Sequence, residues 1–66
     1  MIVKINGKDE TVEKKLNLAE LVAVKKLSPE KIVMEYNLRI VPKDEWRDVI
    51  LQENDHIEII SFVGGG

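Results

Sequence analysis

Apolar and polar residues alternate from the first position of the chain. Met1, Val3 and Ile5 fall on one side of the alternation and the residues between them on the other, which predicts a strand with one buried face. Asn6-Gly7 follows directly, and Asn-Gly between two extended runs is a strong hairpin signal because both turn positions favour a positive φ. The returning strand is expected over residues 8–13, where the many charged side chains favour the edge of a sheet.

A helix start follows the first hairpin. Asn17 stands three residues before Glu20, the spacing of a capping box in which each side chain accepts a hydrogen bond from the other residue's backbone amide. Leu16 and Leu21 lie at the positions of a hydrophobic staple. We expect the helix to continue to about Lys26 and to bury its apolar side on a sheet.

Three further apolar runs predict three more strands, over residues 32–36, 39–41 and 56–61. The first two are separated by Asn37 and Leu38, which we expect to turn the chain. A proline directly after the second run ends it, because proline cannot donate a hydrogen bond to a sheet.

The elements follow the order β-β-α-β-β-β, which predicts an α+β protein of two layers. We expect a mixed sheet of about four to five strands with one main helix packed on one face, as in the ubiquitin-like β-grasp architecture. By analogy with that fold, the last strand is expected at the centre of the sheet, parallel to the first. We assign residues 1–61 to this domain and residues 62–66 to a flexible C-terminal tail.

Composition narrows the classes of function. The chain has 66 residues, of which 12 are acidic and 10 basic, and its net charge is −2. A nucleic-acid-binding domain is expected to be basic, and no apolar run approaches the length of a membrane span. We therefore expect a cytoplasmic protein, monomeric when free, that binds neither nucleic acid nor membranes. The chain has no cysteine, which excludes disulfides, thiol nucleophiles and thiolate metal ligands.

The last five residues are Phe62-Val63-Gly64-Gly65-Gly66. Glycine has no side chain to bury and loses the most backbone freedom when it is ordered, so three in a row add nothing to a core. The three glycines span roughly 10 Å when extended, and all five residues about 17 Å, which is enough to thread a narrow channel in a partner. A linker remnant would have the same composition, and the tail alone does not separate these two interpretations.

Two segments in the second half of the chain resemble a known family. Residues 37–46, NLRIVPKDEW, are similar to the Asn-Gly-x-Ile-Val-Pro-Arg-x-x-Trp segment of the ThiS-type sulfur carriers of the thiamin pathway. Residues 51–66, LQENDHIEIISFVGGG, resemble the last turn, strand and tail of the same ubiquitin-like carriers. The Asn6-Gly7 hairpin and the chain length also fit, so the resemblance covers nearly the whole chain.

The chain departs from the family pattern at three positions. Leu38 replaces a turn glycine and is expected to resist a primed turn, so this hairpin should be longer or of another type. Asn54 replaces a glycine, and asparagine tolerates the left-handed conformation that such a position needs. Lys43 replaces an arginine and cannot form the planar fork of a guanidinium, which would change a contact with a partner.

The resemblance implies a carrier protein rather than an enzyme. A ThiF-like adenylyltransferase would use ATP and Mg²⁺ to adenylate the Gly66 carboxylate, and sulfur from a cysteine desulfurase would convert it to a thiocarboxylate. A ThiG-like thiazole synthase would then receive the sulfur while it builds the thiazole of thiamin. Gly64 and Gly65 would let the tail thread into these partners. The chain itself is expected to bind no cofactor or metal and to carry no catalytic residue.

A partner-binding surface is expected beside the tail. If Ile57 and Ile59 face the helix, strand alternation turns Ile60 and Phe62 outward. Together with Val63 they would form an apolar patch at the root of the tail, where a partner could dock.

Other residues that invite a functional interpretation are assigned to the structure. Asp55 and His56 resemble part of a catalytic triad, but no nucleophile is placed to join them. Trp46 is expected in the core with its indole N–H on a backbone carbonyl, and Tyr36 on the surface of the sheet.

Two other functions stay open. A MoaD-like small subunit of molybdopterin synthase shares the fold and the thiocarboxylate chemistry, although such chains tend to be longer and lack the Ile-Val-Pro…Trp pattern. A ubiquitin-like interaction or tagging module would use the same tail without sulfur chemistry. Intact mass of the protein from cells would separate these classes.

Overall fold

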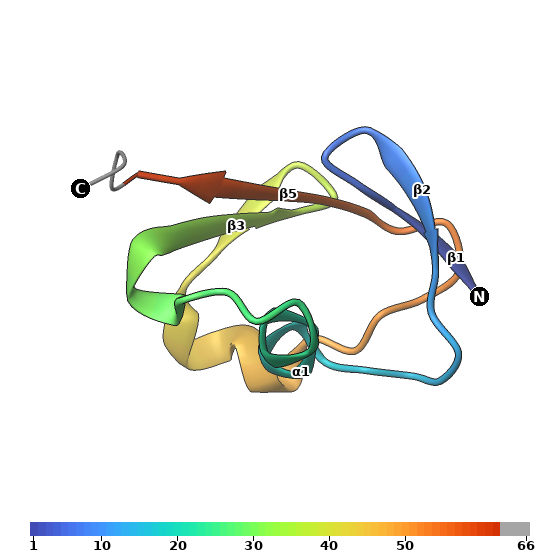
Figure 1. Cartoon of the computed structure of the whole chain (residues 1–66), viewed down its shortest axis with the longest axis horizontal. Helices are drawn as coiled ribbons and strands as arrows, with labels where there is room; N and C mark the ends of the chain where they lie inside the picture. The colour runs from blue at the N-terminus through green and yellow to red at the C-terminus, as the bar shows by residue number, and fades with distance from the viewer. Residues whose placement is uncertain (63–66) are drawn as a thin grey trace.

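Five strands form one mixed sheet, in the order β2-β1-β5-β3-β4, in the computed structural model, which describes residues 1–62. The strands are β1 (Ile2–Ile5), β2 (Lys8–Thr11), β3 (Ile32–Tyr36), β4 (Arg39–Val41) and β5 (His56–Ser61); the helices are α1 (Leu18–Val24) and two short 3₁₀ helices, η1 (Pro29–Lys31) and η2 (Lys43–Asp48). The helix α1 lies on one side of the sheet (Figure 1). Strand β5 is central and parallel to β1, and β2 is an edge strand. The expected α+β β-grasp arrangement is confirmed.

The first hairpin turns through Asn6 and Gly7, whose φ angles of 51° and 82° are both positive, as the sequence predicts. The Asn6 side chain also bonds to β5. Its Oδ1 accepts from Ile59 N at 2.7 Å, and its Nδ2 donates to Ile59 O at 3.3 Å. Because the backbone N of Asn6 already donates to Ile57 O at 2.9 Å, the amide side chain continues the β1–β5 pairing by one further step.

The helix α1 begins with the predicted capping box. The Asn17 side chain accepts from Glu20 N at 2.8 Å, and the Glu20 carboxylate accepts from Asn17 N at 2.9 Å. The helix ends at Val24, short of the expected Lys26, because Lys26 adopts a left-handed φ of 58° and leaves the helical conformation. Its apolar side is buried, as expected.

The second hairpin contradicts one expectation. Asn37 and Leu38 form a two-residue turn with φ angles of 49° and 73°, and Tyr36 pairs directly with Arg39 across it. Leu38 therefore occupies the primed-turn position that a leucine is expected to resist. Asn37 imposes this geometry, because its backbone N donates to His56 O at 2.8 Å and its Oδ1 accepts from His56 N at 2.8 Å.

The hydrophobic core lies between α1 and the inner face of the sheet. Its largest completely buried side chains are Leu18, Met34, Leu51, Ile57, Val3 and Val22. Leu51 is notable because it belongs to no helix or strand and lies in the connection between η2 and β5, where its backbone N donates to Leu16 O at 2.8 Å. Trp46 is buried, and its indole N–H donates to Val41 O at 2.9 Å, as predicted.

Candidate functional site

Two of the residues expected to bind a partner, Ile60 and Phe62, are exposed where β5 ends. Side chains alternate along β5, and the buried Ile57 points toward α1, so Ile60 points away from it. Ile60 is 47 % exposed and Phe62 is 59 % exposed. The backbone N of Phe62 donates to Lys31 O at 3.1 Å, which extends the pairing of β5 with the segment that enters β3. Their contact with a partner stays a prediction.

The other predicted site residues, Val63, Gly64, Gly65 and Gly66, lie outside the described residues. Their roles in partner contact, threading and adenylation therefore stay predictions. The strand that precedes them, β5, is paired with β1 on one side and β3 on the other. The residues that lead into the tail thus start from the centre of the sheet.

The face of the sheet opposite α1 carries exposed apolar side chains together with charged and polar ones: the two carboxylates of Glu35 and Glu58, and Lys4 opposite His56. Across β4, β3 and β5, Ile40 lies opposite Glu35, and Glu35 lies opposite Glu58. In the next row, Val33 lies opposite Ile60. Ile40 is 61 % exposed. We call this surface the outer face and define it by Val33, Glu35, Ile40, Glu58, Ile60 and Phe62.

Asp55 is a buried carboxylate, 7 % exposed, held by three hydrogen bonds. Tyr36 Oη donates to Oδ2 at 2.6 Å, Gln52 N donates to the same oxygen at 2.7 Å, and Asn37 Nδ2 donates to Oδ1 at 3.2 Å. Burial, and then the hydrogen bond to Asp55, raise the pKa of Tyr36 to about 12. Asp55 therefore joins the turn after β3 to the turn before β5, which is a structural role.

The hydrogen bonds to Asp55 were not predicted from the sequence. Tyr36 is half-buried against the core rather than on the sheet surface, because its hydroxyl reaches Asp55, which is 19 positions away along the chain. Asn54 does adopt the left-handed conformation predicted for it, with a φ of 70°. The conformation of Asn54 can be predicted because it depends on the residue type at that position. The Tyr36–Asp55 hydrogen bond cannot, because its two residues are far apart along the chain and leave no local pattern.

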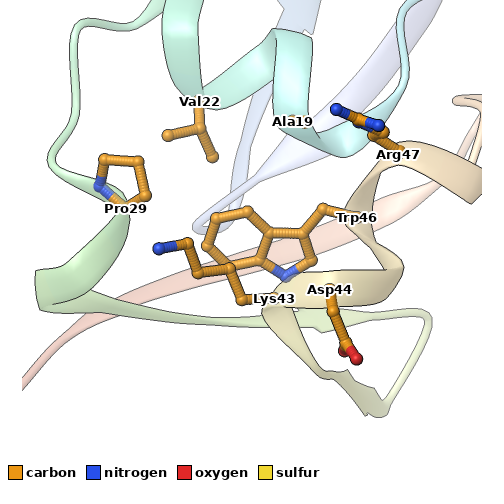
Figure 2. A pocket seen from close by; sticks show the side chains of 7 residues that line it. All are labelled: Ala19, Val22, Pro29, Lys43, Asp44, Trp46 and Arg47. Carbon is orange, nitrogen blue, oxygen red and sulfur yellow. The ribbon is translucent and has the colours of Figure 1, made fainter.

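An open hollow lies on the helix side of the molecule, between α1 and η2. It is lined by Ala19, Val22, Pro29, Lys43, Asp44, Trp46 and Arg47 (Figure 2). The Lys43 Nζ is 3.2 Å from the Glu30 carboxylate, and this hydrogen bond lowers the pKa of Glu30. The lysine that stands in place of an arginine thus contacts its own chain, and the hollow is separate from the outer face.

Within residues 1–62, no three His, Cys, Asp or Glu side chains lie close enough together to hold a metal ion. Over the same part of the chain, no helix has the length and apolar character needed to cross a bilayer.

Comparison with known proteins places these features in a family. Residues 3–66 match the model of the ThiS family. The chain is 35 % identical over 66 residues to the sulfur carrier protein ThiS of Bacillus subtilis, and the match covers 98 % of this chain and 100 % of that protein. It is also similar to the crystal structure of a thiamine biosynthesis protein, ThiS, from Geobacter metallireducens, with a TM-score of 0.87, 29 % identity and full coverage of both chains.

Two larger proteins contain a segment similar to the whole chain. Both are named thiazole synthase; the one from Magnetococcus marinus is 35 % identical over 66 residues, and the one from Paramagnetospirillum magneticum is 32 % identical over the same length. Each match covers 100 % of this chain but 20 % of the larger protein, so the chain spans about a fifth of the length of these relatives.

Proposed function

The chain belongs to the ThiS family of sulfur carrier proteins, and on this premise we propose that it carries sulfur, as a thiocarboxylate on Gly66, for thiazole formation in thiamin biosynthesis. The observation that carries the proposal is the family match, which extends through residue 66. The composition supports it as well. The chain has no cysteine, so it cannot hold sulfur on a thiol, and the Gly66 carboxylate is left as the group to be sulfurated.

The chemistry requires two partners that act on the same acyl carbon. In the first step, a carboxylate oxygen of Gly66 attacks the α-phosphorus of ATP in a ThiF-like adenylyltransferase, and pyrophosphate leaves with Mg²⁺. In the second, the outer sulfur of a persulfide formed by a cysteine desulfurase attacks the acyl carbon, and AMP leaves. The product is an acyl disulfide that joins Gly66 to the protein that carried the persulfide. A second thiol of that protein then attacks its own sulfur in this S–S bond, so that a disulfide forms within that protein, supplies the two electrons and releases the thiocarboxylate. We propose that the reaction takes place in the cytoplasm.

A thiazole synthase is proposed as the acceptor of this sulfur. Two relatives named thiazole synthase contain a segment similar to the whole chain, which supports a direct partnership between such a carrier and a ThiG-like synthase. The proposed role of the carrier is to bring its acyl carbon into the synthase on a tail that needs little space. Glycine suits this role because it has no Cβ to obstruct the acyl carbon or the channel.

The proposal is tested by the intact mass of the full chain after incubation with the adenylyltransferase, Mg-ATP and a persulfide donor. The expected product is heavier by the difference between one sulfur and one oxygen atom, and this difference disappears when ATP is omitted. Mass added through an isopeptide bond to other proteins' lysines would instead indicate a tagging module. Sulfur delivered to a molybdopterin synthase large subunit but not to a thiazole synthase would indicate the alternative carrier.

The glycine at the end of the chain gives a sharper version of the test. Gly66→Ala is expected to slow thiocarboxylate formation sharply, because its Cβ crowds the acyl carbon, and Gly65→Ala to hinder entry of the tail. Val24→Ala, at an exposed position of α1, serves as the control and should react like the unchanged chain. Wild-type rates for both tail variants would contradict the steric argument.

A further inference from the structure

We propose that Asn6 is a positioning residue for the chemistry at Gly66: its side-chain amide holds the end of β5 and so fixes the direction in which the chain leaves the sheet toward its last residue. The inference rests on the proposed function and assigns a part in it to a residue of the first hairpin. It is carried by the strand pairing on the two sides of β5 and by the hydrogen bonds of the Asn6 side chain.

The two sides of β5 are paired over different lengths. On one side, the pairing with β3 continues to Ser61, the last residue of the strand. On the other side, the pairing with β1 ends at Ile57. The chain turns back at Asn6 and Gly7, and β5 continues past this hairpin with β3 alongside (Figure 1). Within the described part of the chain, residues 58–61 therefore have no strand beside them on the β1 side.

The Asn6 side chain takes the place of the missing strand. Its Oδ1 accepts from Ile59 N at 2.7 Å, and its Nδ2 donates to Ile59 O at 3.3 Å. A continuing strand would supply these two partners from its backbone, and a primary amide carries the same donor and acceptor. Aspartate could only accept, and glycine could do neither. Asparagine also tolerates the φ of 51° that the turn requires, so one residue meets both demands.

Core packing does little for the end of β5. Ile59 is half-buried against the core, but Ile60 and Phe62 are exposed. An open hollow borders the strand on the helix side of the sheet, and Asn6, Ile59 and Ser61 are among the residues that line it. Within residues 1–62, the end of β5 is thus held by its pairing with β3 and by the two bonds from Asn6.

The direction of β5 matters because the reacting carbon is far from the sheet. Residues 62–66 span about 17 Å when extended, so a small change of direction at Phe62 displaces Gly66 by several ångströms relative to a docked sheet. A strand end that has the correct direction for only part of the time binds productively with an affinity reduced by that fraction. Once the acyl carbon is in place, its reaction is unchanged. Loss of the Asn6 bonds should therefore raise KM and leave kcat alone.

The experiment uses Asn6→Gly and Asn6→Asp in the full chain, because both residues tolerate the left-handed turn. Steady-state release of pyrophosphate is measured with the adenylyltransferase of the source organism and Mg-ATP, at varied concentrations of the carrier. The KM for the carrier is expected to rise about threefold to tenfold in both variants, with kcat within about twofold of the unchanged chain.

The matched control is Asn17→Ala, which removes side-chain hydrogen bonding from α1 rather than from β5. It destabilises the whole fold and should leave KM unchanged. A rise in KM that is confined to the Asn6 variants therefore cannot be explained by lower global stability.

Hydrogen exchange of the free chain gives a second measurement that needs no partner. In Asn6→Gly, the amides of Ile59 and Phe62 are expected to exchange at least about threefold faster, because the strand end opens more often. The amide of Asn37, which bonds to the first residue of β5, is the internal control and should keep its rate. Equal acceleration of all three amides would indicate global destabilisation and would contradict the proposal.

The inference has other outcomes that would overturn it. These are an unchanged KM in both Asn6 variants, an equal rise in Asn17→Ala, or an unchanged exchange rate of the Phe62 amide in Asn6→Gly. A lower kcat at unchanged KM would place Asn6 in a later step and would also reject the positioning role. Intact mass keeps the two proposals apart: if the unchanged chain gains no sulfur on Gly66 the proposed function fails, whereas a sulfurated chain whose Asn6 variants keep the same KM rejects the role of Asn6 alone.

Discussion

Leu38 shows how far the fold can override a single residue's preference. A non-glycine residue with a positive φ is disfavoured by contact between its Cβ and the backbone, yet Leu38 has a φ of 73° and is 92 % exposed. No packing compensates at that position. The stabilising contacts belong to Asn37, which bonds to both the N and the O of His56.

Leu38→Gly is therefore expected to stabilise the chain. Relief of the left-handed conformation gains about 1–2 kcal/mol, and the added freedom of glycine in the unfolded state costs about 0.4–1 kcal/mol, so the net gain should be roughly 0.5–1 kcal/mol. Gly7→Ala is the reverse experiment and, by the same balance, should lose roughly 0.5–1 kcal/mol, since a Cβ at Gly7 meets nothing within 4 Å and the loss comes from the backbone alone. Urea unfolding measures both, and a loss of stability in Leu38→Gly would contradict the interpretation.

The Tyr36–Asp55 hydrogen bond gives a prediction with a defined pH range. The pKa of Tyr36 is raised to about 12 in the folded chain, above its ordinary value of 10.0. Its contribution to the free energy of unfolding is complete below pH 10 and is lost as the pH rises from about 10 through about 12. Tyr36 is the single tyrosine, so the absorbance of tyrosinate reports its titration directly.

The control for this titration is Tyr36→Phe. At neutral pH it should lose about 1–3 kcal/mol, because Asp55 is left with one donor fewer in a buried place. The measurement is the difference between the two proteins, which share every other group: the unchanged chain should lose stability more steeply across this window. Parallel pH profiles would show that the hydroxyl does not stabilise the fold.

The stability of the helix α1 depends on the contacts made by its first turn. The helix Leu18–Val24 has 7 residues, and helices of this length are marginal in isolation, so the capping box and the buried apolar side must support it. The box is visible in the sequence because both of its partners lie within three positions of each other. The end of the helix depends instead on Lys26, which adopts a left-handed conformation. No residue pattern marks that position, so the end of the helix is predicted less accurately than its start.

Asn17→Ala should lower the free energy of unfolding by about 1 kcal/mol, the usual value of an N-terminal cap. Asn17→Ser restores a side-chain acceptor at the same position and should recover most of the loss. Chemical denaturation of the three proteins checks this. An equal loss in both variants would show that the amide side chain acts through some contact other than the cap.

The whole molecule is small, so the loss of one core side chain can remove much of its free energy of unfolding. For 66 residues the expected free energy of unfolding is about 3–10 kcal/mol. Leu51→Ala removes a completely buried side chain and should cost about 2–5 kcal/mol, a large share of that total. Val24→Ala, on the exposed side of α1, should cost less than about 1 kcal/mol. Thermal unfolding followed by circular dichroism compares them, and a loss of similar size in both would contradict the burial argument.

Much of the fold is predictable from the sequence because its signals are local. The Asn6-Gly7 turn, the Asn17–Glu20 box and the strand patterns each depend on residues within a few positions of one another. The outward direction of Ile60 follows from strand alternation alone. Family resemblance then supplies the sheet order and the role proposed for Gly66, which no periodicity contains.

The remaining features arise only when distant segments meet. Asp55 is buried because Tyr36 and Asn37 reach it from another turn, and Leu38 is held left-handed by the same junction. Glu35 faces Glu58 because of the register between β3 and β5, and register is a relation between strands that neither strand encodes by itself. The amino-acid sequence by itself thus determined the elements and their buried sides, through short-range contacts. The tertiary structure decided which polar and charged groups share a surface, because that depends on the order and alignment of the strands.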